Sequence, residues 1–132
     1  MIFGTEPGTY DLAVFKRLEG YLCVCDDGAI SVPFIQTSPK YRGQGYCKAF
    51  LNELPRDRPV IFPCVISPQL EGMLKRRGFQ ECTWWNPDHG EWDYDAMVRL
   101  PPGYKCKNDL LGGVPIAFPV TDPNPVRTFE LR

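Results

Sequence analysis

ISVPFIQTSPKYRGQGYCKAFL, residues 30–51, is the stretch around which the chain is organised. Its first part, residues 30–35, is rich in β-branched and aromatic side chains and predicts a strand, which the Thr-Ser-Pro turn at 37–39 ends. Apolar residues at positions 46, 49 and 50 then follow helical spacing, so a helix is predicted to begin directly after Gly45. The order is therefore strand, glycine-containing turn and helix.

The turn before this helix has the features of a phosphate site. The first N–H groups of a helix have no intrahelical partner and the helix dipole adds partial positive charge there, so this end attracts anions. Gly43 and Gly45 let the backbone approach an anion and adopt dihedral angles that other residues resist. Lys40 and Arg42 add cationic side chains beside the turn.

The heptapeptide PKYRGQG, residues 39–45, resembles the acyl-CoA pyrophosphate loop of the GNAT superfamily of acetyl-CoA-dependent N-acetyltransferases, whose motif is Arg/Gln-x-x-Gly-x-Gly/Ala. Arg42 matches the first motif position and Gly45 the second. Cys47 stands at the last position, which is usually Gly or Ala, and cysteine is also small. Taken alone, so short a match fits equally well a plain turn that binds no ligand.

A second segment, SPQLEGMLKRRGF at 67–79, extends the resemblance. Ser67 and Pro68 favour the start of a helix, and Gly78 favours its end. The apolar stripe of this helix consists of Leu70, Met73 and Leu74. The segment is similar to the second conserved GNAT segment, a helix after a strand that ends in a basic residue, a hydrophobic residue, Gly and Phe. Together the two segments make the resemblance cover residues 20–100.

Length and composition set the remaining limits. A chain of 132 residues is expected to form one domain. Its formal net charge of −1 gives no reason to expect nucleic acid as the main partner. Because no apolar run reaches the roughly 18 residues of a membrane span and no signal core is visible at the start, we expect a cytoplasmic protein without a membrane partner.

The six cysteines are expected to be buried, reduced thiols rather than disulfides or zinc ligands. The chain has no C-x-x-C pair, and His89 is its only histidine, so no metal site is predicted. His89 itself is expected to be a plain surface residue on a hairpin tip.

The other elements follow from periodicity and turn residues. A helix is predicted at 9–19, strands at 20–25 and 29–37 joined by the Asp-Asp-Gly turn, and a buried, parallel strand at 59–66. Strands at 79–86 and 91–100 should form a hairpin. In the second, Trp92, Tyr94, Ala96, Val98 and Leu100 alternate with the charged Glu91, Asp93, Asp95 and Arg99.

The predicted fold is a single α+β or α/β domain of GNAT type, with a mixed, mostly antiparallel sheet that splays in its middle and is flanked by helices. Residues 1–100 would form the acyltransferase domain, with a reduced N-terminal part. Residues 101–132, rich in Pro and Gly, are read as an extension packed on that domain, with a short strand at 126–131. The extension is a candidate interface for a protein partner or a second copy of the chain.

The resemblance implies transfer of an acetyl group from acetyl-CoA to a primary amine of a small molecule or protein, by direct attack in a ternary complex. It also implies which residues bind the cosubstrate: Ile35, Gln36, Thr37, Lys40, Arg42, Gly43, Gln44, Gly45, Tyr46, Cys47 and Ser67. The pantetheine arm would pair like an extra strand with the backbone of residues 35–37. The sheet would splay at the same place.

Two departures from the family concern the chemistry. Ser67 stands where many relatives have an Asn that contacts the cofactor, and Leu74 stands where they have a Tyr that protonates the leaving thiolate. Tyr46, Cys64 or water could replace that Tyr, or the thiolate could leave unprotonated. The catalytic residues are not identified, and the candidates are Tyr46, Cys64, Ser67 and Glu81. Carboxylates considered as the base are Asp26, Asp27, Glu81, Asp93 and Asp95.

Two alternatives stay open. The first is a GNAT-like module that has lost its catalysis and acts as a protein-binding or structural component, which Leu74, Cys47 and the apolar, Pro-rich tail favour. The second is an unrelated α+β domain with a chance glycine turn.

Overall fold

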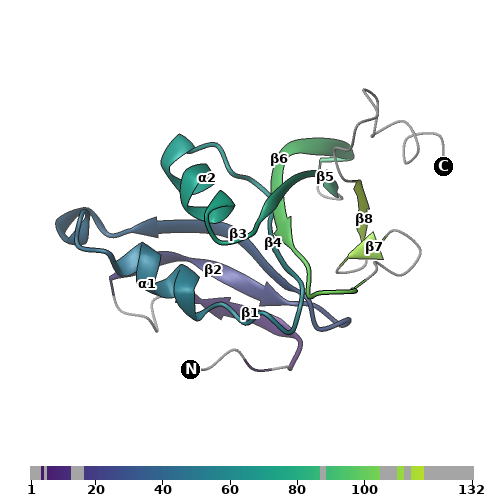
Figure 1. Ribbon diagram of the computed structural model, residues 1–132, viewed down its shortest axis with the longest axis horizontal. Coiled ribbons are helices and arrows are strands. Elements are labelled where there is room, and N and C mark those ends of the chain that lie inside the picture. The colour runs from purple at the N-terminus through teal and green to yellow at the C-terminus, as the bar shows by residue number, and fades with distance from the viewer. Residues whose placement is uncertain are drawn as a thin grey trace.

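The computed structural model describes residues 4, 6–12, 17–86, 89–104, 110–111 and 114–117. These residues form an α+β fold in which two helices lie on one face of a mostly antiparallel sheet (Figure 1). The strands are β1 (Gly8–Asp11), β2 (Leu18–Val24), β3 (Ile30–Thr37), β4 (Val60–Phe62), β5 (Gln80–Asn86), β6 (Glu91–Arg99), β7 (Leu110–Leu111) and β8 (Val114–Ala117). The helices are α1 (Tyr46–Glu53) and α2 (Pro68–Lys75). The strand order is β1-β2-β3-β4-β6-β5-β8-β7.

The predicted hairpin between β2 and β3 is confirmed. The two strands pair antiparallel, and at their turn the Cys25 N–H donates to the Ala29 carbonyl at 2.8 Å. The Asp27 carboxylate accepts from the Ala29 N–H at 3.0 Å, and Gly28 takes a φ of +87°. This Asp-Gly turn chemistry was readable from the sequence because it depends on neighbouring residues only.

The sheet splays between β3 and β4, the one parallel pair of strands among the described residues. Their pairing consists of Ile30 with Val60 and Ser31 with Ile61, and it stops there. Just beyond, Pro33 occupies the irregular part of the β2–β3 ladder, where its missing N–H costs no regular ladder bond. The rest of β3 therefore has a strand partner, β2, on one side only.

Two sequence predictions are wrong about element type or length. Residues 9–19 were expected to be helical, but residues 8–11 form β1, which pairs with β2, and β2 begins at Leu18. The β-forming Thr9 and Tyr10 gain a ladder there that a weak helical period does not outweigh. The strand expected at 59–66 ends at Phe62, and the Val65 N–H instead donates to the Asp95 carbonyl at 2.7 Å.

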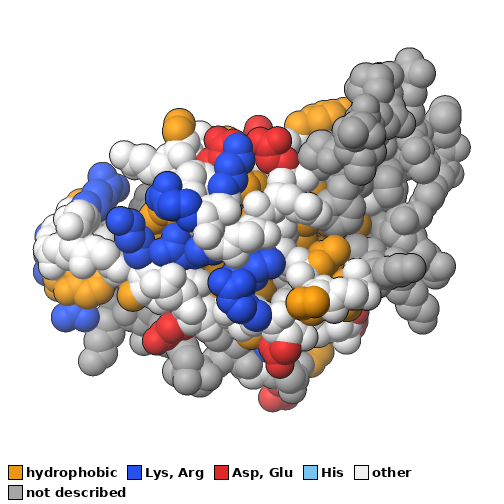
Figure 2. Space-filling model, in the orientation of Figure 1, with side chains coloured by type: hydrophobic (Ala, Val, Ile, Leu, Met, Phe, Trp, Pro, Cys, Tyr) orange, Lys and Arg blue, Asp and Glu red, His pale blue; other side chains and the backbone are white. Residues whose placement is uncertain are grey.

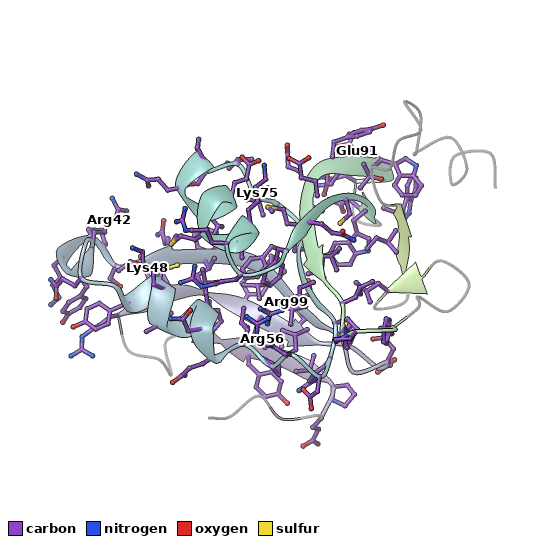
Figure 3. The ribbon with its side chains drawn as sticks, in the orientation of Figure 1. Arg42, Lys48, Arg56, Lys75, Glu91 and Arg99 are labelled. Atoms are coloured by element: carbon purple, nitrogen blue, oxygen red, sulfur yellow. The ribbon has the colours of Figure 1, made fainter. Side chains whose placement is uncertain are left out.

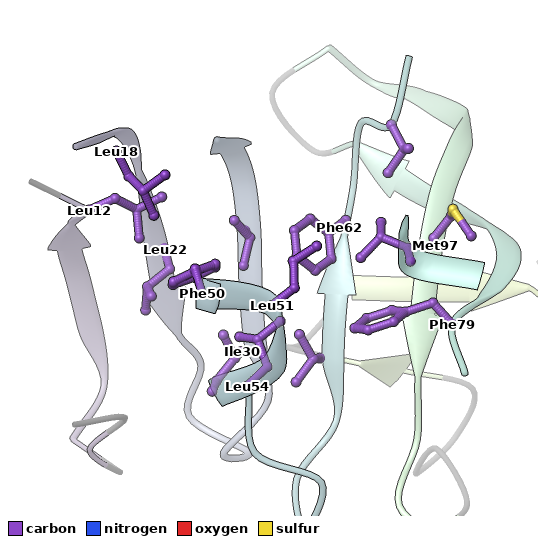
Figure 4. Close-up of a cluster of buried hydrophobic side chains, with 14 of the residues drawn as sticks. Leu12, Leu18, Leu22, Ile30, Phe50, Leu51, Leu54, Phe62, Phe79 and Met97 are labelled. Atoms are coloured by element: carbon purple, nitrogen blue, oxygen red, sulfur yellow. The ribbon is translucent and has the colours of Figure 1, made fainter. Parts of the chain in front are cut away.

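The main hydrophobic core lies between the helices and the sheet (Figure 4). Of the predicted stripe, Phe50 is buried in this core and Tyr46 packs against it, whereas Ala49 is exposed and Leu51 and Leu54 are buried instead. The rings of Phe62 and Phe79 meet edge to face with centroids 5.4 Å apart. Burial of these large side chains is the dominant favourable contribution to the stability of this half of the fold.

A second core lies on the opposite face of the sheet, where Leu111 and Ile116 of the C-terminal extension are fully buried against Ile61 and Val98. Strand β8 also extends the sheet, because Thr83 and Trp84 of β5 pair with Ala117 and Ile116. The extension therefore packs on the sheet over its described part. The strand predicted at 126–131 lies outside the described residues.

The strict alternation predicted for β6 fails in both halves of the strand. Tyr94 is 61% exposed, whereas Met97 and Arg99 are buried together with Ala96 and Val98. The reason is that β6 lies between β4 and β5 and has a core on each of its faces, so in-and-out alternation no longer separates apolar from polar residues.

The buried Arg99 joins the ends of both helices (Figure 3). Its guanidinium donates to the carbonyls of Leu54 and Pro55, after α1, at 3.2 and 3.1 Å. It also donates to the carbonyl of Arg77, after α2, at 3.1 Å, and lies 4.8 Å from the Phe79 ring centroid. The C-terminal end of a helix has unpaired carbonyls and partial negative charge, so one buried cation satisfies both ends. Burial lowers the pKa of Arg99.

We predict that Arg99→Met lowers the free energy of unfolding by about 3 kcal/mol, because three carbonyls lose their donor while they stay largely covered. Arg99→Lys should recover only part of this loss, because an ammonium lacks the planar fork of donors. Urea unfolding measures both values, with the exposed Lys48→Met as the matched control. A loss for Arg99→Met no larger than that of the control would contradict the stabilising role of the Arg99 bonds to the two helix ends.

Candidate functional site

A cavity of about 890 Å³ lies between the end of β3, the following turn, α1 and α2. Its lining residues are Ile35, Gln36, Thr37, Tyr41, Arg42, Gly43, Gly45, Tyr46, Cys47, Lys48, Ser67, Gln69, Leu70, Gly72, Met73 and Arg76. Three of them, Arg42, Lys48 and Arg76, are cationic and none is acidic. Figure 2 shows Lys and Arg side chains gathered on this helix-bearing face. The cavity is therefore positive in a chain of net charge −1.

The glycines of the turn set the geometry of the cavity floor. Gly43 and Gly45 take φ values of +77° and +85°, and Gly45 is the N-cap of α1. A Cβ at either position would meet no atom within 4 Å, so glycine is required there by the backbone conformation and not by space. The first bond of α1 runs from the Ala49 N–H to the Gly45 carbonyl, so the preceding N–H groups are available to an anion.

Most of the residues predicted to bind the cosubstrate line this cavity. The exceptions are Lys40, whose ammonium lies 5.2 Å from the Tyr41 ring centroid, and Gln44, whose amide donates to the Lys40 carbonyl at 3.5 Å. Arg42 lines the cavity and its Nε donates to the Thr37 carbonyl at 3.4 Å. This bond links the turn to the end of β3.

A further residue, Arg17, contributes to the site and was not predicted from the sequence. Its guanidinium carbon lies 5.3 Å from the Tyr41 ring centroid and 4.7 Å from that of Tyr46, and the two rings meet edge to face. Its carbonyl accepts from the Ser38 N–H at 2.9 Å. Cation–π contacts of this kind are worth about 0.5–2 kcal/mol each, so Arg17 helps to hold two lining rings in place.

One wall of the cavity is apolar and includes the neutral thiol of Cys47. Ile35, Leu70 and Met73 belong to this wall and pack against the main core. Burial raises the pKa of the Cys47 thiol, so the start of α1 carries no thiolate charge that would repel an anion. Ser67 caps α2 as predicted, and its Oγ accepts from the Leu70 N–H at 3.3 Å.

The candidate catalytic residues separate into two groups. Tyr46 and Ser67 line the cavity, whereas Cys64 and Glu81 do not. Glu81 lies 3.6 Å from Lys75, which also pairs with Glu71 at 2.9 Å. That pairing lowers the pKa of Glu71 and raises that of Lys75. The carboxylates considered as a base, Asp26, Asp27, Glu81, Asp93 and Asp95, all lie outside the lining.

Leu74, on α2, is fully buried in the main core. It does not line the cavity. The lining has no Asp, Glu or His side chain among the described residues, and its hydroxyl and thiol groups are those of Thr37, Tyr41, Tyr46, Cys47 and Ser67. The lining therefore offers cations that can bind an anion, but no carboxylate or imidazole that could accept a proton.

Comparisons with protein-family models, curated proteins and solved structures found no match to the chain. Within the described part of the chain, no group of three or more His, Cys, Asp or Glu side chains is placed to hold a metal ion. None of the helices in the described ranges is long and apolar enough to cross a membrane.

The described cysteines differ in burial, although all were expected to be buried, and this difference allows a chemical test of the cavity wall at Cys47. Cys64 is exposed, Cys23, Cys25 and Cys47 are half-buried, and Cys82 is buried. Burial, together with the Asp27 carboxylate, raises the pKa of Cys25 to about 11.

We predict that iodoacetamide near neutral pH alkylates the exposed Cys64 much faster than Cys25 and Cys47, because the thiolate is the reactive form and burial raises the pKa of the latter two thiols. Peptide mass spectrometry over time gives each rate, with unfolded protein as the control in which the rates converge. Labelling of Cys47 at the rate of Cys64 would show that its surroundings are not as described.

Proposed function

We propose that the chain binds acetyl-CoA in this cavity and transfers the acetyl group to a primary amine of a small molecule or protein. The observation that carries the proposal is the combination of a glycine-capped helix start and three cations around a cavity without a carboxylate. Such a surface favours a ligand with several negative charges, and the pyrophosphate and 3′-phosphate of coenzyme A are such groups.

The splay of the sheet supports the same ligand. Beyond Ser31, β3 has no pairing with β4, while Ile35 and Thr37 pair with Gly20 and Leu18 of β2 on the other side. The residues 35–37 line the cavity, so their backbone is placed to pair with an extended amide-containing arm. Pantetheine has two amides in an extended chain and fits this role.

In the proposed complex the pyrophosphate lies on the N–H groups at the start of α1, and Arg42 adds a charge-assisted bond. Arg76 and Lys48 contribute further positive charge from α2 and α1. Acetyl-CoA supplies an activated thioester. The chain holds it beside the amine, whose nitrogen attacks the carbonyl carbon as the C–S bond breaks and the amine loses a proton. Placing the two reactants together can itself supply a large part of the rate.

The second candidate function is binding of coenzyme A without turnover. The buried Leu74 and the absence of an acidic or imidazole side chain from the described lining favour it. The two functions share the cavity and differ only in chemistry, so a binding measurement tests both and a turnover measurement separates them.

We predict that acetyl-CoA raises the melting temperature of the protein, because a ligand at a hundred times its dissociation constant stabilises the folded state by about 2.7 kcal/mol. Arg42→Glu and Arg76→Glu should each weaken binding about tenfold or more, because each replaces an attractive charge with a repulsive one. Arg56→Glu, an equal change of charge at an exposed position outside the cavity, is the matched control.

No stabilisation by millimolar acetyl-CoA would rule out both candidate functions. Where stabilisation is found, release of free coenzyme A thiol in the presence of a panel of primary amines distinguishes transfer from binding alone.

A further inference from the structure

Three consecutive cations, Lys75, Arg76 and Arg77, stand at the end of α2. Lys75 pairs with Glu71 at 2.9 Å, and Nε of Arg77 donates to the Asn52 side chain at 2.8 Å. Arg76 lies between them in the sequence and lines the cavity. Within the described ranges its side chain has neither an ion pair nor a hydrogen bond. Of the three, Arg76 is therefore the cation that is available to a ligand in the cavity.

The guanidinium of Arg76 lies along α2 and not beyond its end. A Cβ built on Gly72 would be 3.4 Å from Nη1 of Arg76, so the charged group lies beside the preceding helical turn. There it gains little from the partial negative charge at the end of the helix. Gly72 also lines the cavity, although glycine within a helix is destabilising relative to alanine. This wall of the cavity thus presents a positive charge beside bare backbone.

Lys48 contributes a second cation, from α1. It is the third residue of α1, whose first turn has no acidic residue and whose N-cap makes no side-chain hydrogen bond. A cation in the first turn of a helix is unfavourable, because it adds to the partial positive charge of the N–H groups there. Lys48 lines the cavity and, among the residues that the structure describes, has no ion pair that would compensate this charge. An anionic ligand would supply the compensation.

Arg42 belongs to a different element, the turn before α1, where Figure 3 shows it apart from the helices. Its Nε donates to the Thr37 carbonyl at 3.4 Å. Its charge therefore lies with the glycine turn and the first N–H groups of α1, to which the pyrophosphate is assigned above. The cavity thus has cations from the turn and cations from the two helices, and it suits a ligand with two separate phosphate groups.

We propose that Arg76, assisted by Lys48, binds the 3′-phosphate of coenzyme A, and that this contact makes the cavity select coenzyme A over ligands that have only its pyrophosphate. The inference rests on the proposed function. A phosphate monoester carries a charge of about −1.5 to −2 at pH 7, which is more than the charge on either phosphate of the pyrophosphate. A guanidinium can bind two of its oxygens at once, and an ammonium adds a point charge.

Two ligands that differ only in this group test the inference: coenzyme A and 3′-dephospho-coenzyme A, each titrated into the purified protein by calorimetry. We expect wild type to bind coenzyme A about tenfold more tightly, because the charge-assisted contact is lost with the phosphate. Arg76→Gln should abolish this preference by weakening the binding of coenzyme A alone, and Lys48→Gln should reduce it. Arg42→Gln should weaken the binding of both ligands by the same factor and keep the preference. Lys75→Gln, which removes the same charge next to Arg76 but outside the cavity lining, is the matched control and should change neither affinity.

Equal binding of both ligands to wild type, or a preference that persists in Arg76→Gln, would overturn this inference and leave the proposed function in place. Equal weakening of both ligands by Arg76→Gln would also overturn it, because Arg76 would then act on the whole ligand and not on the 3′-phosphate. No binding of either ligand to wild type would overturn both this inference and the proposed function. The melting temperatures of the ligand-free variants are measured in parallel and should match that of wild type, because Arg76 and Lys48 are exposed.

Discussion

The fold depends on one buried cation at the place where two helices end. Arg99 reaches from the centre of the sheet to the carbonyls that follow α1 and α2, so the C-terminal ends of both helices are tied to the same side chain. A second tie runs from Nε of Arg77 to the Asn52 side chain at 2.8 Å. The cavity lies between the start of α1, at Tyr46, and one side of α2, from Gln69 to Arg76 at its end, so the contact that fixes the two helices together also fixes the two walls of the cavity. The buried Arg99 bonds thereby help to set the shape of the site.

The second organising feature is the separation of charge across β3. The cavity on the helix side is lined by cations, whereas a hollow on the opposite face, on β1 and β2, is lined by the acids Asp11 and Glu19. A net charge near zero conceals this pattern, because the two sets cancel in the sum.

Local signals in the sequence were sufficient for the hairpins, the glycine turn and the start of α2, because each depends on residues close together in the chain. The errors at 9–19 and 59–66 have another cause, since strand pairing and the splay of the sheet are decided by distant segments. The importance of Arg99 was missed because it occupies an outward position in an alternating pattern, and only the presence of a core on both faces of β6 buries it. Arg17 was missed because its ring partners, Tyr41 and Tyr46, lie more than twenty residues further along the chain, in the turn after β3 and at the start of α1.

The central claim is that the start of α1 holds the phosphates of coenzyme A. The most direct measurement is a titration of ¹⁵N-labelled protein with coenzyme A, in which every backbone amide reports separately. The account predicts that the amides of Gly43, Gly45, Tyr46 and Cys47 move together and saturate, while those of the β5–β6 hairpin stay in place. Shifts confined to other parts of the surface, or no shift at all, would contradict it.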